Sequence, residues 1–192
     1  YLRRLFKGFR GSVTGSLSKS SPPIPHHMRA TLAQTVSFYQ QLDDTDKPKF
    51  EQRAMLFLET TNIVGTGVDV DAADCILVAA SAIIPVWRFD NWHYINLHSV
   101  ILFPHAFNYK LQCKEVDSTI TGMVGTEDMH GKMLLSKPAL HLGFTNSRDK
   151  QNVGIHAFVH LIYMLYGSCD GLPERLFDNH FPIPGFQVVH EK

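Results

Sequence analysis

Two histidines one helical turn apart are the side chains of this sequence best placed to do chemistry. His156 and His160 lie in the run His156-Ala157-Phe158-Val159-His160. Residues at positions i and i+4 of an α-helix share a face, so both imidazoles would point the same way. This spacing lets two ring nitrogens bind one Zn²⁺ at about 2.0–2.1 Å, with the backbone already holding the pair in place. The sequence therefore indicates a candidate metal site.

The residue that follows the first histidine limits what such a site could do. In the H-E-x-x-H pattern of metalloproteases this residue is a glutamate, which accepts a proton from the zinc-bound water and passes it to the leaving amine. Ala157 stands at that position, and a methyl group cannot accept a proton. Histidines four residues apart on a helix also occur as structural side chains with satisfied hydrogen bonds. The pair by itself leaves that structural interpretation open.

The two histidines need a helix, and the surrounding pattern predicts one over residues 149–167. Asp149, or Ser147 or Asn146 before it, could accept hydrogen bonds from the free N–H groups at the helix start, and Gly167 could end the helix. An apolar stripe at helical spacing would bury this helix, with the histidines at its edge. The members of the stripe are Ile155, Phe158, Val159, Ile162 and Tyr166.

Apolar periodicity and turn residues predict the elements around this helix. A helical hairpin is expected over 32–42 and 48–58, and a nearly all-apolar helix over 71–84, where Pro85 would end it. The mixture predicts an α+β fold dominated by helices, with a small mixed sheet beside the histidine-bearing helix. The short strands are expected at 62–70, 95–103, 118–124 and 132–136.

The composition is that of one ordinary folded domain. The chain has 192 residues, 44% of them hydrophobic, and 18 basic side chains balance 18 acidic ones. A net charge of zero gives no broad positive field, so direct binding of nucleic acid is not expected. The 3 cysteines are widely spaced and form no C-x-x-C pair. They predict neither a disulfide framework nor a thiolate zinc site, and they indicate a reducing, cytoplasmic location.

Residues 1–25 differ from the rest of the chain. A basic amphipathic stretch at 2–10 precedes a Ser- and Pro-rich linker, and the folded domain is expected over 26–192. Basic residues interleaved with Leu and Phe can touch an anionic membrane, but this stretch is short, and a frayed terminus is the simpler interpretation. The apolar runs of the sequence are shorter than the roughly 20 residues of a membrane span.

Four motifs along the chain are more distinctive than the histidine pair. They are Asn62-Ile63-Val64-Gly65, Gly122-Met123-Val124-Gly125, the stretch 131–140 and Asn152-Val153-Gly154-Ile155-His156. Together with intervening residues, over about positions 28–190, they resemble the MtfA family of zinc-dependent metallopeptidases. Its name-giving member, Mlc titration factor A, also binds the glucose-responsive repressor Mlc. The resemblance implies a peptide or protein substrate and a transcriptional-repressor partner.

The resemblance also implies a zincin fold and assigns roles to residues. His156 and His160 match the two histidine ligands of zinc, and Ala157 stands where the general base belongs. Family members commonly carry an acid near the end of this helix, where this chain has Tyr163 and then Tyr166, two phenols that could fill the altered site. The third ligand, a glutamate, would lie beyond the last residue, so we expect the C-terminal helices of the domain to be missing.

These departures lead to two alternative functions. The first is a zinc metallopeptidase domain that is inactive as written and binds zinc weakly or not at all, because a catalytic zinc requires three protein ligands and a water. The alternative is a non-catalytic protein-binding or regulatory module, a pseudo-peptidase on the same scaffold.

In zincins a strand beside the active-site helix binds the substrate peptide by edge pairing. The β-leaning stretch at 132–136 is our candidate for that strand by analogy and β-propensity. Its residues are Lys132, Met133, Leu134, Leu135 and Ser136.

Two other groups of residues carry weaker signals. Cys169 could form a nucleophilic pair with His160 or His180, but no recognisable pattern orients a base toward the thiol or lowers its pKa, so a structural role is favoured. A further set of histidines alternates with apolar residues in and around the strand expected at 95–103, which suggests rim or core positions and not a second metal site. These are His93, His98 and His105.

Overall fold

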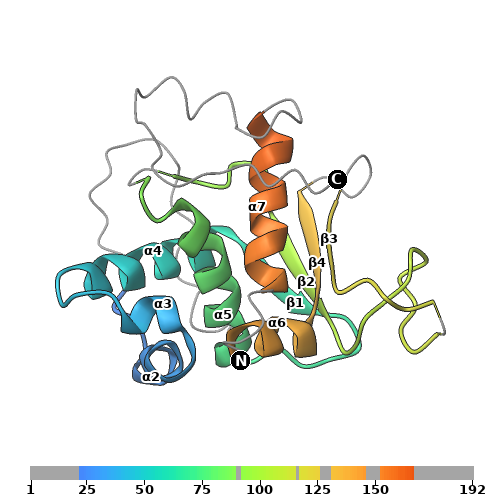
Figure 1. Cartoon of the computed structure of the whole chain (residues 1–192), viewed down its shortest axis with the longest axis horizontal. Helices are drawn as coiled ribbons and strands as arrows, with labels where there is room; N and C mark the ends of the chain where they lie inside the picture. The colour runs from blue at the N-terminus through green and yellow to red at the C-terminus, as the bar shows by residue number, and fades with distance from the viewer. Residues whose placement is uncertain (1–21, 90–91, 116, 126–130, 146–151, 167–192) are drawn as a thin grey trace, which may run out of the picture.

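The computed structural model describes residues 22–89, 92–115, 117–125, 131–145 and 152–166, with side chains up to Tyr163 in the last of these segments. Helices dominate, and four strands form one small mixed sheet, which confirms the predicted α+β fold (Figure 1). The elements are α2 (His26–Thr35), α3 (Ser37–Gln40), α4 (Asp46–Thr60), β1 (Asn62–Gly65), α5 (Ala72–Ile83), the 3₁₀ helix η1 (Ile84–Val86), β2 (Ser99–Phe103), β3 (Gly122–Val124), β4 (Lys132–Ser136), α6 (Lys137–Thr145) and α7 (Val153–Tyr166).

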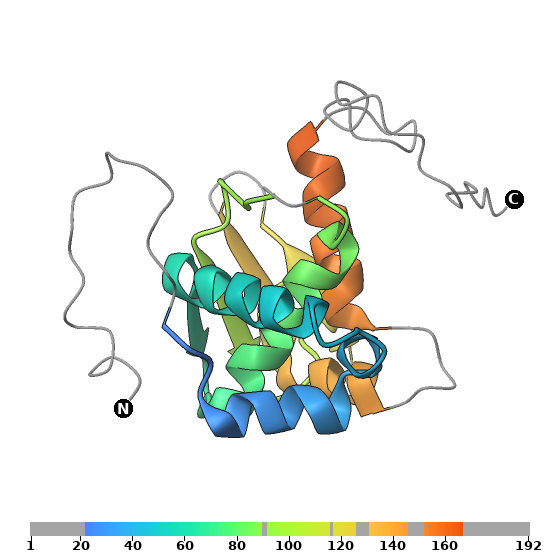
Figure 2. The same ribbon diagram turned by 90° about the vertical axis from the view of Figure 1, so that its left-hand side faces the viewer.

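The sheet has the strand order β1-β2-β4-β3. The pairs β1–β2 and β2–β4 are parallel, and β3 runs antiparallel to β4. Strand β4 is therefore paired on both sides, and β3 lies at the edge of the sheet. Helix α7 packs against β3 and β4 and also contacts α5, so it lies over this edge on the helix-covered face (Figure 2).

The long segment between β2 and β3 covers part of the opposite face of the sheet. Phe107 is fully buried there with Phe103 and Leu134, and its ring centroid lies 4.9 Å from that of Phe103. The backbones of Phe107 and Ile120 exchange two hydrogen bonds of 2.9 Å, which close this segment into a loop.

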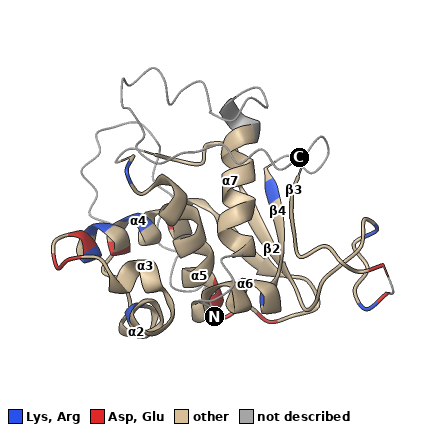
Figure 3. Ribbon diagram, in the orientation of Figure 1, with Lys and Arg blue, Asp and Glu red and all other residues tan. Residues whose placement is uncertain are grey.

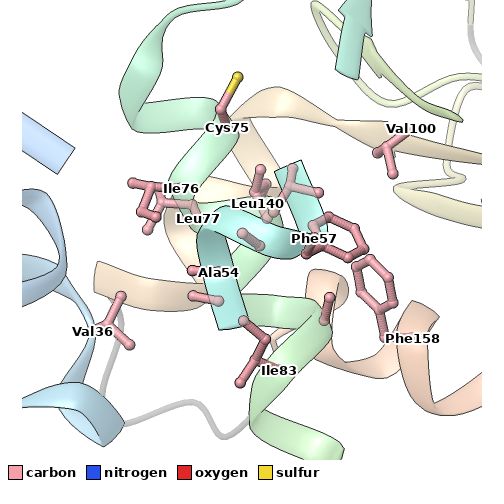
Figure 4. Packing of buried hydrophobic residues seen from close by; sticks show 14 of the residues in the cluster. Val36, Ala54, Phe57, Cys75, Ile76, Leu77, Ile83, Val100, Leu140 and Phe158 are labelled. Carbon is pink, nitrogen blue, oxygen red and sulfur yellow. The ribbon is translucent and has the colours of Figure 1, made fainter. Parts of the chain in front are cut away.

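Helix α5 is the centre of the core. From Asp74 to Ile83 every residue of it is buried, and it contacts α2, α4, α6 and α7. Asp71 and Asp74 form a capping box at its start. Pro85 in η1 follows its end, as predicted. Apolar side chains of these helices meet around it, and Figure 4 shows those of Ala54 and Phe57 from α4, Leu140 from α6 and Phe158 from α7.

Most predicted elements are present with different boundaries. The helix predicted over 32–42 is two helices, because Val36 between α2 and α3 has an extended backbone. The strands predicted over 62–70 and 95–103 are only β1 and β2, and the one predicted over 118–124 begins at Gly122. The shortening has one physical reason: strand length is set by the pairing partner and not by local propensity.

Helix α6 was not predicted. It begins at Lys137, directly after the last residue of β4. Pro138 lies in its first turn, where N–H groups have no partner within the helix, so proline's lack of an N–H costs no hydrogen bond. No turn residues separate β4 from α6, so the sequence pattern alone does not show where the strand ends and the helix begins.

A buried carboxylate joins α5 to α6. Asp74 is 0% exposed, and its carboxylate lies 2.8 Å from Lys137 Nζ and 2.7 Å from His141 Nε2. Burial raises the pKa of Asp74, but hydrogen bonds from Lys137, the Asp71 N–H and His141 outweigh burial and hold this pKa below its usual 3.8. The ionised form is thus bound in place, and the start of α6 is tied to the start of α5.

We predict that Asp74→Asn lowers the free energy of unfolding by about 2–4 kcal/mol at pH 7, because it removes the anion that pairs with Lys137. The folded-state pKa of Asp74 lies below its unfolded value, so its contribution is present above pH 3.8 and is lost as pH falls below that value. Urea denaturation at pH 7 and pH 3 should show the variant and the original chain converging in acid.

The matched control is Asp44→Asn, since the Asp44 side chain is fully exposed. We expect this change to stay within about 0.5 kcal/mol. Equal effects of the two substitutions at pH 7 would contradict the assigned role of Asp74.

Candidate functional site

The helix that carries the two histidines begins at Val153. Asn152 caps it: its Oδ1 accepts a 3.0 Å hydrogen bond from the Ile155 N–H. The helix therefore starts later than the predicted residue 149, and the three side chains proposed as its cap lie outside the described residues. On the buried side of α7, Phe158 packs its ring 5.7 Å from that of Phe57 and 5.1 Å from that of Tyr94 (Figure 4).

His156 and His160 project together from the exposed side of α7. Their Nε2 atoms are 3.0 Å apart, and the rings meet edge to face at 77°. A neutral imidazole donates from one ring nitrogen and accepts at the other, so one ring donates to its neighbour. Burial lowers the pKa of His156, and the nearby His160 lowers it further. The lowered pKa favours the neutral imidazole, which is the form that binds a metal ion.

The distance between the two Nε2 atoms suits one metal ion bound by both imidazoles. A tetrahedral Zn²⁺ with Zn–N bonds of about 2.0–2.1 Å separates two ligand nitrogens by about 3.3 Å. The observed 3.0 Å requires only a small ring movement to match. Within the described part of the chain, no group of three or more His, Cys, Asp or Glu side chains could hold a metal. The described residues therefore provide two ligands, and the remaining positions would need donors from elsewhere or water.

A cavity of about 320 Å³ opens between α7 and the edge strand β3. His156, Ala157 and His160 all line it, so the structure brings together the three residues that the motif singled out. Tyr163 lies one turn further along α7, is half-buried and is not part of the lining; the side chain of Tyr166 lies outside the described residues. The remaining lining residues are Thr121, Gly122, Met123, Val124 and Val153.

The strand predicted to bind substrate is in the wrong position for edge pairing. Met133, Leu134 and Leu135 pair with β2 on one side and with β3 on the other, and the Lys132 carbonyl and the Ser136 N–H also bond to the β3 segment. The backbone of β4 is therefore occupied. The strand at the edge, beside the histidines, is β3, and this correction follows from strand order, which local sequence does not reveal.

Two glycines position the site, and sequence reasoning about chemistry overlooked their role. A Cβ on Gly154 would lie 2.3 Å from Ser81 Oγ of α5, and a Cβ on Gly122 would lie 2.8 Å from Val153 Cγ2 of α7. Both distances are shorter than a side chain tolerates, so each glycine permits a close approach. Gly154 brings α7 against α5, and Gly122 brings β3 against α7. Both residues lie within the motifs of the family resemblance, which is the signal that could have pointed to them.

Two histidines one helical turn apart beside an edge strand are the arrangement of a zincin-like metallopeptidase domain, and comparison with known proteins supports this class. The family model of the glucose-regulated metallo-peptidase M90 matches residues 14–182. The chain belongs to this family.

A second comparison found an uncharacterized protein of Synechocystis sp. (strain PCC 6803) that is 25% identical over 162 residues. The match covers 79% of this chain and 58% of that relative, so the chain spans little more than half of the relative's length. No solved structure matches significantly. Among the described residues, no helix is long and apolar enough to cross a membrane.

We predict that Gly154→Ala destabilises the protein by about 1–3 kcal/mol, because the new methyl group collides with Ser81 at the α5–α7 contact. This loss should appear even though alanine favours an isolated helix over glycine by about 1 kcal/mol. Adding Ser81→Ala should recover part of it in a double-mutant cycle measured by urea denaturation. A Gly154→Ala variant as stable as the original chain would show that the two helices are not held this closely.

Proposed function

We propose that this chain is a zincin-type metallopeptidase domain that binds Zn²⁺ weakly through His156 and His160 and does not hydrolyse peptides as written. One observation carries the proposal. Ala157 lies in the wall of the cavity beside the histidine pair, where a general base would have to stand. Loss of a general base lowers a rate by about 10²–10⁴-fold. The described residues supply two protein ligands, and a site with two protein ligands holds its metal poorly.

The residues of the cavity keep several features that peptide hydrolysis needs. A bound Zn²⁺ would act as a Lewis acid and lower the pKa of its water to about 7. His156 and His160 would hold it at the mouth of the cavity, in the neutral form that burial of His156 favours. In the described part of the chain no strand pairs with the outer edge of β3, so its backbone can bind an extended peptide by strand addition.

The alternative is a protein-binding module that uses the same groove without catalysis. The same observation at Ala157 favours it, because the edge strand and the cavity are kept while the proton-accepting side chain is absent. A transcriptional-repressor partner, implied by the resemblance to the MtfA family, belongs to this alternative. The match covers 58% of the length of the Synechocystis relative. What the whole protein does is therefore also a proposal, for either function.

We predict that the chain binds one Zn²⁺ with a dissociation constant on the order of 10⁻⁵ M, as expected for two histidine ligands and water. Competition with a chromophoric chelator measures this affinity. His160→Ala should abolish binding, whereas His98→Ala should not, because His98 is an exposed histidine outside α7. Absence of zinc binding, or equal loss in both variants, would contradict the metal site.

We also predict that Ala157→Glu, loaded with zinc, shows chelator-sensitive hydrolysis of a denatured protein substrate at least about 10²-fold above the unmodified chain. Ala157→Gln fills the same space without accepting a proton and should stay at the unmodified level. Hydrolysis by the unmodified chain that equals that of Ala157→Glu would show that another group serves as base.

A further inference from the structure

The outer edge of β3 offers backbone groups at alternate residues. Hydrogen bonds of 2.8 Å join the Thr121 carbonyl and the Gly125 N–H to β4, so the odd-numbered residues of this stretch bond to β4. In an antiparallel pair the residues between them turn their N–H and C=O groups away from the partner strand. Gly122 and Val124 therefore present these groups to the outer edge.

The same edge is already occupied two residues before Gly122. Ile120 exchanges two backbone hydrogen bonds of 2.9 Å with Phe107 in an antiparallel bridge. Ile120 alternates in step with Gly122 and Val124, so Phe107 lies on the outer edge, roughly 7 Å along the strand from the first open position. Figure 1 shows the chain between β2 and β3 projecting past the β3 side of the sheet. We call residues 105–113 the stop segment, because a strand added along β3 would run into it.

The stop segment is held firmly in place. The ring of Phe107 is fully buried against the face of the sheet. The next side chain, Asn108, is only 4% exposed, and its Oδ1 accepts hydrogen bonds of 3.0 and 2.9 Å from the N–H groups of Lys110 and Gln112. Its Nδ2 donates a 3.0 Å hydrogen bond to Asp117. A peptide that displaced this segment would have to break these hydrogen bonds and expose a buried ring.

The side chains of β3 do not themselves prevent further pairing. Edge strands are commonly protected by charged residues, by proline or by a covering loop. The residues of β3 are Gly, Met and Val, without charge or proline, whereas the interior strand β4 begins with Lys132 (Figure 3). Within the described part of the chain, the stop segment therefore protects one end of this edge and leaves Gly122 and Val124 available.

We propose that the stop segment restricts the peptide that β3 binds to a short or bent segment. The inference rests on the proposed function, in which β3 binds a peptide by strand addition. Antiparallel pairing is the more stable arrangement, and it directs the C-terminal part of the peptide toward Ile120. The peptide must end or turn away after the residue opposite Gly122, because Phe107 occupies the next pairing position. The cavity beside the histidine pair is lined by β3, so this restriction acts at the candidate site.

The first test follows amide hydrogen exchange of the 192-residue chain by NMR, with and without the blocked heptapeptide N-acetyl-Thr-Lys-Thr-Val-Thr-Lys-Thr-amide. When extended, this peptide is about 23 Å long and exceeds the 3 residues of β3. We expect saturating peptide to slow exchange at Gly122 and Val124 at least about fivefold and to leave Phe107 unchanged.

Two results would contradict this expectation in different ways. Faster exchange at Phe107 when Gly122 and Val124 are slowed would show that the peptide displaces the stop segment, and it overturns this inference alone. Slowing at neither Gly122 nor Val124 overturns this inference together with peptide binding by β3. This test needs no substituted protein, so it stands even if a variant fails to fold.

The second test weakens the stop segment. Asn108→Ala removes the side chain that holds it, so the heptapeptide should displace Phe107 from Ile120 and speed exchange at Phe107 at least about fivefold. The matched control Asn96→Ala changes an exposed side chain and should behave as the original chain does. Circular dichroism establishes that both variants are folded. Equal behaviour of the two folded variants contradicts the role of Asn108.

The third test shows which end of the peptide meets the stop segment. A nitroxide is attached to either end of the heptapeptide, and broadening of the Ala106 and Tyr109 amide signals is measured. We expect broadening from the C-terminal label, because an extended peptide of this length separates its ends by about 20 Å. Broadening from the N-terminal label alone overturns the antiparallel orientation. Equal broadening by both labels shows that neither end is fixed, and it overturns the inference.

Discussion

The close approach of α7 to α5 and to β3 is the constraint on which the candidate site depends. Two glycines allow it, because Gly154 leaves no side chain to collide with Ser81 and Gly122 leaves none to collide with Val153. Phe158 then anchors the opposite side of the helix in the aromatic core. As a result the solvent-exposed histidine pair lies beside the edge of the sheet, and a cavity forms where the helix and the strand meet.

The helices that support α7 are held together by polar as well as apolar interactions. Asp74 is ionised and buried, and its bonds to Lys137 and His141 connect α5 to α6, the helix that precedes α7 in the chain. A buried carboxylate without these partners would destabilise the fold, so the three residues act as one unit. The two histidines of α7 thus rest on a core whose helix positions are set by few, specific contacts.

The site has the histidine pair and the edge strand of a zincin but not its general base. The histidine pair keeps a spacing that suits Zn²⁺, and the edge strand keeps a backbone that can receive a peptide. Ala157 lines the cavity beside this pair and carries no group that could accept a proton.

The sequence alone determined the features that depend on local periodicity. The i, i+4 spacing of His156 and His160, the apolar stripe of their helix and the absence of a base at Ala157 could all be read directly. The tertiary structure decided what depends on distant residues. It made β3 the edge strand and β4 an interior strand, because strand order follows from pairing partners far apart in the chain. It also placed Gly122 and Gly154 at the two contacts where a side chain would clash, which no local pattern shows.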